Sequence, residues 1–226
     1  MIKGHKTNPP ASAALFTIGT AAPASAVRGR RARRAAETRV RLFRCALELI
    51  AERGLANVTV EDITEAADVG KGTFFNYFAS KDHVLGVMAE IQLGKVREAA
   101  AQAAPFDKSI YSVLHHLIRR LAEEPGRSPR LARAMISSFL ASENVREILK
   151  RNMRDGRKTI AEVIALGQQR GEINAQLKKE KIAIQLLQAV MGTVLIWSLH
   201  EEPPLASWME DSFQHAWRAI SAPGKE

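Results

Sequence analysis

The sequence predicts an all-α protein, and three observations support this prediction. Apolar residues recur at helical spacing in almost every segment after residue 36, and no segment alternates apolar and polar residues as a strand does. Glycine or proline separates the helical segments from one another. A chain of 226 residues is long enough to bury a hydrophobic core. We therefore expect a small N-terminal unit of three helices followed by a larger helical bundle.

Residues 1–36 are expected to form a disordered, low-complexity tail that ends in a basic arm. The apolar run in this tail resembles a secretory signal, but threonine and glycine residues interrupt it, so we reject that interpretation. Eight arginines lie between Arg28 and Arg44, against one acidic residue, Glu37. A run of this kind favours nucleic acid as a partner, and the alternative is that it is merely a solvated tail.

Residues 37–82 are expected to form the three-helix unit. Gly54 ends the first helix, and Thr59 caps the second, with Asp62 three residues on in the position of a capping box. A tight turn follows, and the third helix is short. The three helices are expected at residues 37–53, 60–67 and 71–78.

Residues 83–222 are expected to form one helical domain for ligand binding and dimerisation. Ser80 caps its first helix, and Gly171 ends a long helix in its middle. The Pro125-Gly126 and Pro203-Pro204 pairs end two others. The helices are expected at residues 81–104, 107–123, 129–140, 142–170, 179–200 and 205–220.

The segment GKGTFFNYF, residues 70–78, combines small, polar and aromatic residues. Phe74 and Phe78 are four residues apart, so they share one helix face and should hold the third helix against the first two. On the other faces, glycine lets the backbone approach DNA closely, and lysine and asparagine can bind phosphates or base edges. This is the pattern of a helix-turn-helix, and the alternative is a plain pair of core helices. The expected DNA contacts are Lys71, Gly72, Thr73, Asn76 and Tyr77.

The stretch TVEDITEAADVGKGTFFNYFASKDHVL, residues 59–85, resembles the DNA-binding region of the TetR family of transcriptional regulators. The resemblance extends over residues 37–88 and implies a homodimer, readout of the major groove by the third helix, and a ligand pocket in the larger domain. It also implies that Thr59 and Lys81 bind phosphate. Three positions depart from the family pattern. These are Asp68 in place of glycine, Gly70 in place of serine and Phe75 in place of tyrosine.

The basic arm gains a second interpretation from this resemblance. Lying just before the first helix, it could enter the minor groove or follow the phosphates, as homeodomain arms do. The arginines that we expect to contact DNA are Arg31, Arg33 and Arg34.

The last two helices are expected to form the dimer surface. A wide apolar face is formed by Ile184, Leu187, Val190, Met191, Val194 and Leu195. Gly192 allows close approach of another helix. The alternative is that this face is core within one chain. The expected interface residues are Leu187, Met191, Leu195, Trp208 and Trp217.

A ligand pocket is expected among the helices of residues 81–200. Methionine and aromatic residues at helical spacing mark it, although such residues also form plain core. Few charges accompany them, which predicts an apolar or weakly anionic ligand. The expected lining residues are Phe106, Tyr111, Leu114, Met135, Phe139, Met153 and Trp197.

The chain contains no pattern typical of catalysis, of a cofactor or of a metal site. His115 and His116 are adjacent, so they face about 100° apart on a helix and make a poor metal pair. The single cysteine, Cys45, lies among apolar residues and fits a reducing cytoplasm. No window has the roughly 18 uninterrupted apolar residues of a membrane span.

We therefore predict a DNA-binding transcriptional regulator rather than an enzyme. It is expected to be a repressor that binds a palindromic operator as a homodimer and is released by a small apolar effector. The alternative is an architectural DNA-binding protein without an effector, which weak sequence selectivity would favour.

Overall fold

The computed structural model describes residues 26–200, 202 and 204–223, with side chains from residue 32 onward. Within these ranges the chain is helical and contains no strand, as predicted, apart from one isolated bridge between Ile173 and Ser221. Residues 1–25 of the expected tail lie outside the described part. The α-helices are α1 (Ala26–Arg53), α2 (Val60–Ala66), α3 (Lys71–Phe75), α4 (Lys81–Ala103), α5 (Ile110–Leu121), α6 (Pro129–Ala141), α7 (Glu143–Gln169), α8 (Lys179–Trp197) and α9 (Leu205–Ile220).

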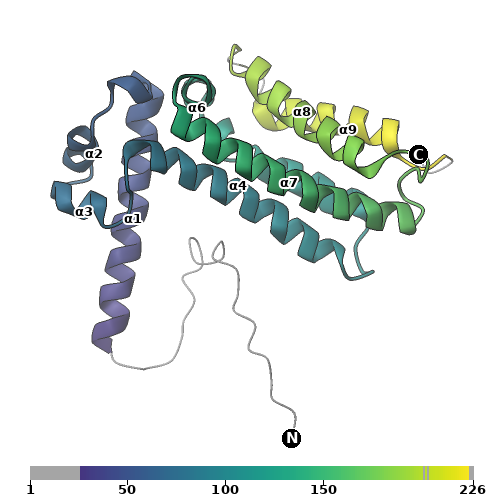
Figure 1. Cartoon of the computed structure of the whole chain (residues 1–226), viewed down its shortest axis with the longest axis horizontal. Coiled ribbons are helices and arrows are strands. Elements are labelled where there is room, and N and C mark those ends of the chain that lie inside the picture. The colour runs from purple at the N-terminus through teal and green to yellow at the C-terminus, as the bar shows by residue number, and fades with distance from the viewer. Residues whose placement is uncertain (1–25, 201, 203, 224–226) are drawn as a thin grey trace, which may run out of the picture.

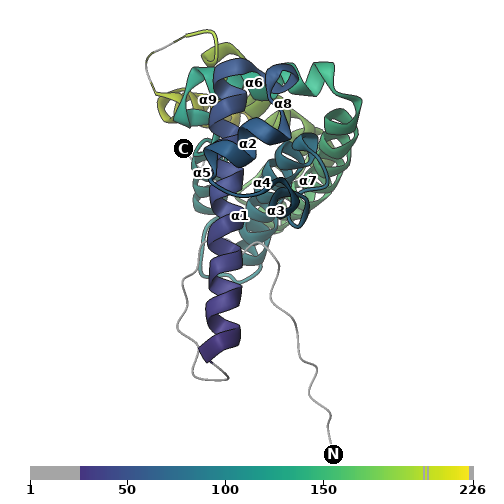
Figure 2. The same cartoon turned by 90° about the vertical axis from the view of Figure 1, so that its left-hand side faces the viewer.

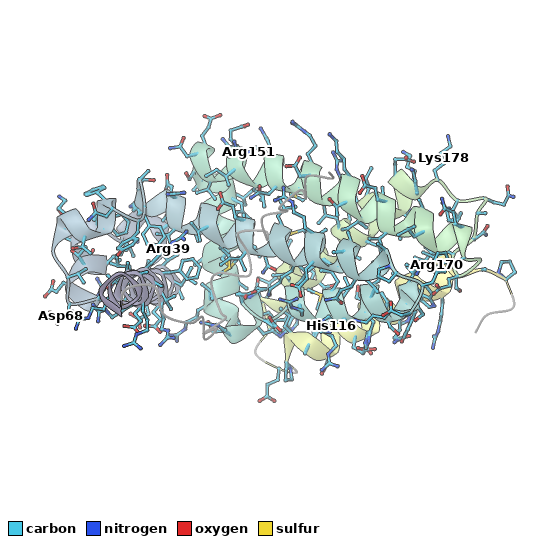
Figure 3. The ribbon with its side chains drawn as sticks, turned by 90° about the horizontal axis from the view of Figure 1, so that it is seen from below. Arg39, Asp68, His116, Arg151, Arg170 and Lys178 are labelled. Carbon is cyan, nitrogen blue, oxygen red and sulfur yellow. The ribbon has the colours of Figure 1, made fainter. Side chains whose placement is uncertain are left out.

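The helices form two unequal parts that are joined by α4 (Figure 1). Helices α1, α2 and α3 form one end of the molecule. Helix α4 runs from there along α7 for the length of the bundle, and α8 and α9 pack beyond α7. Asp68 lies at one end of the molecule, and Arg170 and Lys178 lie near the other (Figure 3).

The start of α1 differs from the prediction. The helix begins at Ala26 instead of Glu37, so residues 26–36 continue it. The physical reason is composition, because alanine and arginine are among the strongest helix formers and this segment contains little else. An ion pair between Arg33 and Glu37, one turn apart, also stabilises this part of the helix. In two perpendicular views α1 extends beyond α2 and α3 as an unaccompanied helix (Figures 1 and 2).

The predicted caps of the N-terminal unit are confirmed. Thr59 and Asp62 form a complete capping box, with the Thr59 amide donating to the Asp62 carboxylate over 2.7 Å. These bonds from Thr59 lower the pKa of Asp62, chiefly through the threonine hydroxyl. Gly54 ends α1 at a φ of 77°, and the side chain of Ser80 accepts from the His83 amide at the start of α4.

The turn between α2 and α3 places Asp68 at a φ of 49°. This is the left-handed region, which favours glycine but which Asp tolerates better than most residues. Asp68 therefore adopts a backbone conformation that glycine adopts more readily. Helix α3 is shorter than predicted and ends at Phe75, because the chain turns at residues 76–77 before entering α4.

The described residues bury two hydrophobic cores. The N-terminal core holds Ile50, Ile63, Phe74 and Phe78, and the C-terminal core fills the bundle. The prediction that Phe74 and Phe78 anchor α3 is confirmed, since both are buried with ring centroids 5.4 Å apart. The N-terminal core also takes side chains from the first two turns of α4, from α6 and from the start of α7. These are Val84, Leu85, Val87, Met88, Leu131, Ala134 and Val145.

Candidate nucleic-acid interface and ligand cavity

Helix α3 presents a polar, accessible surface on the side away from the core. Lys71, Gly72 and Asn76 are exposed, and Thr73 and Tyr77 are half-buried. A Cβ added to Gly72 would meet no atom within 4 Å, so its backbone is open to a close approach. Phe75 is also half exposed, at 50%, between these polar groups. The expected contact residues therefore lie on α3 and on the turn that follows it, and all five are at least partly accessible.

The two lysines of this unit have different surroundings. Lys71 pairs with Glu61 of α2, and this hydrogen bond is the main reason why the pKa of Glu61 is lowered. Lys81 instead points inward along the connection between α1 and α2. Its ammonium donates to three backbone carbonyls there, those of Leu55, Ala56 and Val58, over 2.7, 3.3 and 2.8 Å.

The geometry of Lys81 gives it a structural role that the sequence did not reveal. Carbonyls at the end of a helical turn have no partner within the turn, and a cation satisfies them. At the short 3₁₀ turn η2 (Leu55–Asn57), the Leu55 carbonyl accepts from the Val58 amide, and the Lys81 ammonium adds bonds to this carbonyl and to those of Ala56 and Val58. Lys81 therefore joins the first turn of α4 to the start of α2, where Thr59 lies.

The basic extension of α1 carries exposed arginines. Arg33 and Arg34 are both exposed, and Arg33 pairs with Glu37 over 3.4 Å. Arg31 lies in the same helix, but its side chain is outside the described part of the structure. Arg39 lies further along α1 (Figure 3).

The bundle contains an apolar cavity of about 150 Å³. It lies among α4, α5, α6, α7, α8 and α9, and its lining residues carry no charge. Leu85 and Met88 of α4 line it and also belong to the N-terminal core. The cavity therefore adjoins both parts of the molecule.

Four of the seven expected pocket residues line this cavity, namely Leu114, Met135, Phe139 and Met153. Three do not. Phe106 is 85% exposed in the α4–α5 connection, where the Arg170 guanidinium lies 4.3 Å from its ring centroid. Tyr111 faces α9, with Trp217 5.2 Å away between ring centroids, and Trp197 is buried in the C-terminal core.

Two polar residues of the lining were missed by the sequence analysis. Gln92 on α4 and Asn152 on α7 are the polar members of an otherwise apolar lining. The sequence signal for such a residue is a single amide within an apolar helix stripe. Gln92, for example, lies four residues after Met88 and four before Val96, on the same helix face. Such an amide is ordinary on a helix surface, so the pattern alone did not single it out.

The expected dimer residues fall into three environments. Leu187 and Met191 line the cavity, and Leu195 is exposed. Trp208 and Trp217 are half-buried and pack against the C-terminal core of their own chain. The accessible face of α8 and of the turn that follows it includes other residues. These are Gln185, Gln188, Gly192, Leu195, Ile196 and Leu199.

Among the described helices, α8 alone has the length and apolar composition that would suffice to cross a membrane. Core helices of globular proteins pass the same test. Here α8 packs against α7 and α9 and contributes five side chains to the cavity lining.

The histidines do not form a metal site in the described part of the chain. His115 bonds to Glu210 over 2.6 Å. The hydrogen bond from Gln214, and after it the one from His115, lowers the pKa of the Glu210 carboxyl. His116 is exposed (Figure 3).

Comparison with known proteins agrees with this architecture. Residues 42–88 match the model of the tetR family of bacterial regulatory proteins. YvdT, an HTH-type transcriptional regulator of Bacillus subtilis, is 31% identical over 78 residues, which are 34% of this chain and 40% of that protein. The chain thus spans less than half the length of this relative. EthR, an HTH-type transcriptional regulator of Mycobacterium tuberculosis, is 25% identical over 89% of this chain and 96% of its own.

Among solved structures, the complex of SmeT from Stenotrophomonas maltophilia with triclosan has the same fold. It superposes with a TM-score of 0.68 at 19% identity and covers 83% of this chain and 93% of that one. These relatives are transcriptional regulators and not enzymes, as we expected of this chain. Residues 42–88 of this chain therefore match the segment that defines the tetR family of bacterial regulatory proteins, and they include the helix-turn-helix formed by α2 and α3.

Proposed function

We propose that this chain is a ligand-responsive transcriptional repressor that binds a palindromic operator as a homodimer. The observation that carries the proposal is the position of the cavity. Its lining includes Leu85 and Met88, which belong to the core of the DNA-binding unit. A molecule in the cavity therefore touches the side chains that hold α4 against that unit.

The DNA contact is supported by the surface of α3. Lysine and asparagine on an exposed helix of a helix-turn-helix are suited to phosphates and base edges in the major groove. Lys71 is exposed at the start of α3 and Asn76 is exposed at its C-cap, and Gly72 leaves room for the DNA backbone. The half-exposed Thr73 and Tyr77 add hydroxyl groups at its margin.

The homodimer is supported by the exposed face at the end of α8. Leu199 is 66% exposed and Ile196 47% exposed, which is unusual for large apolar side chains that lie one turn apart. Gly192 has no neighbour within 4 Å of an added Cβ, so another helix can approach it closely. A second copy of α8 and α9 would cover this face in a four-helix arrangement.

The effector is supported by the cavity and by the relatives. An apolar cavity of about 150 Å³ is similar in volume to engineered cavities that bind benzene-sized molecules. SmeT, which shares the fold, forms a complex with triclosan. A molecule that binds more tightly to the DNA-incompetent conformation releases DNA by shifting the population.

A reducing cytoplasm is the compartment that fits this proposal. Cys45 is half-buried, and burial raises the pKa of its thiol, so the reactive thiolate is disfavoured.

The proposal is tested by selecting bound sequences from a random duplex library at physiological salt with the purified full chain. Recovery of an inverted repeat, with half-sites about one helical turn apart, is the expected result for a dimeric reader of sequence. Tight binding without a recovered motif would contradict it and would favour an architectural DNA-binding protein, because phosphate contacts alone carry no sequence information.

Two lysine substitutions separate DNA contact from structural support. Lys71→Ala removes an exposed cation, so we expect stability to change by less than about 0.5 kcal/mol, while the salt slope of DNA binding falls by about one for each protomer. Lys81→Met removes three bonds to carbonyls, so we expect a loss of about 1–3 kcal/mol in the free energy of unfolding. Urea unfolding and duplex titration measure both quantities. Unchanged stability of Lys81→Met with weakened DNA affinity would instead support a phosphate contact for Lys81.

The arginines of α1 are tested by their salt dependence. Replacing Arg33 and Arg34 by glutamine keeps the helix-forming tendency of the segment but removes two exposed charges. If these side chains contact phosphates, the slope of log affinity against log salt falls by about 0.9 for every phosphate that the variant no longer neutralises. Glu48→Gln on the same helix serves as the control for a changed exposed charge. An unchanged slope in the arginine double variant would exclude the contact.

A further inference from the structure

The cavity lining contains two amide groups that are incompletely paired. Among the described residues, the buried side-chain atoms without a hydrogen-bond partner include Gln92 Oε1 and Asn152 Nδ2. Both residues line the cavity, where the other side chains are apolar. A buried polar atom without a partner destabilises the folded chain, so a group that bonds to both atoms is bound more tightly than an apolar one.

The two amides lie at the same level of the bundle. An added Cβ at Gly86 of α4 would meet Ile148 of α7 at 3.0 Å, and one at Gly156 of α7 would meet Leu93 of α4 at 3.9 Å. The two helices therefore run in the same direction, and Gln92 and Asn152 both lie between these contacts. At a rise of 1.5 Å per residue, the two contacts place Gln92 and Asn152 about 3–5 Å apart along the helix axes.

The orientation of the Gln92 amide is determined by its neighbours. Its Nε2 donates to Glu124 Oε2 over 3.1 Å and to the carbonyl of Leu121 over 3.4 Å. Turning the amide would place its oxygen against these two acceptors. Lys95, which is only 5% exposed, holds the Glu124 carboxylate with a bond of 2.6 Å. Gln92 therefore offers an acceptor, its Oε1.

This arrangement discriminates between polar groups. A hydroxyl can donate to Gln92 Oε1 and accept from Asn152 Nδ2. A carboxylate has no proton to donate, and no lining residue is a cation that would compensate its charge. The Lys95 ammonium already bonds to Glu123, Glu124 and the Arg120 carbonyl. An ionised ligand head is therefore disfavoured in this cavity.

We propose that the effector is an uncharged, largely apolar molecule with a single hydroxyl group, an alcohol or a phenol, held between Gln92 and Asn152. This narrows the apolar or weakly anionic ligand expected from the sequence to a neutral one. The inference rests on the proposed function only in taking the cavity as the effector site.

The test compares four probes of similar size by titration calorimetry on the full chain: para-butylphenol, para-butylanisole, butylbenzene and para-butylbenzoate. The phenol donates and accepts, the anisole only accepts, the hydrocarbon does neither, and the benzoate is ionised at neutral pH. We expect the phenol to bind at least about tenfold more tightly than butylbenzene, because it forms two additional hydrogen bonds. We expect the anisole to lie between them and the benzoate to bind most weakly.

Two variants and one control test whether the two amides cause the preference for phenol over butylbenzene. Asn152→Leu and Gln92→Met should each reduce the preference for phenol over butylbenzene to about threefold or less, with binding of the hydrocarbon retained. Gln102→Met serves as the matched control, since Gln102 lies on the same helix, bonds to Glu98 and is absent from the cavity lining. It should leave the preference unchanged. If Gln92→Met fails to fold because its bonds to Glu124 and Leu121 are removed, Asn152→Leu alone decides.

Several outcomes would overturn the inference. These are equal affinity for phenol and hydrocarbon, tightest binding of the benzoate, or no binding of any of the four probes. A chain that still recovers an inverted repeat from the duplex library would then keep its proposed role as a regulator and lose only this assignment of the ligand.

Discussion

The two parts of this molecule share their hydrophobic packing, and its other properties depend on that constraint. Helix α4 buries Val84 in the N-terminal core and Val96 in the C-terminal core. Helix α6 does the same with Leu131 and Ala132, one residue apart. Because interiors are close-packed, neither part can shift without repacking these helices. The DNA-binding unit is therefore not a domain on a flexible linker.

This shared packing gives the cavity a physical route to α2 and α3. The cavity lining includes Leu85, one turn beyond Lys81, and the Lys81 ammonium bonds the carbonyls that precede the capping box of α2. A ligand that displaces the start of α4 must move or break these bonds. In the proposed mechanism, the free energy needed to move or break these bonds is the coupling free energy between ligand binding and DNA binding. Bound ligand then lowers the affinity for DNA by the same factor by which bound DNA lowers the affinity for the ligand.

The sequence predicted the helices well where local chemistry determines them. Caps at Thr59 and Ser80 were identified because a hydroxyl at such a position bonds the first free amides of a helix. The start of α1 was predicted wrongly, because a charge run was taken as unstructured although alanine and arginine favour helix. The cavity residues were predicted only in part. Helical spacing places Tyr111 and Met153 on apolar faces equally well, and only tertiary packing shows that Tyr111 faces α9 while Met153 faces the cavity.

The most direct test of the central claim, that cavity occupancy controls DNA binding through α4, requires no ligand. Val190 of α8 lines the cavity, so Val190→Phe is designed to place a ring inside it. The measurement is the affinity of the full-length variant for its selected duplex, with Val190→Ala as the control that enlarges the cavity. Our account predicts at least about a tenfold loss of affinity for Val190→Phe, with folding intact by thermal unfolding and affinity retained in Val190→Ala. Equal affinity of a folded Val190→Phe variant and the unaltered chain would contradict it.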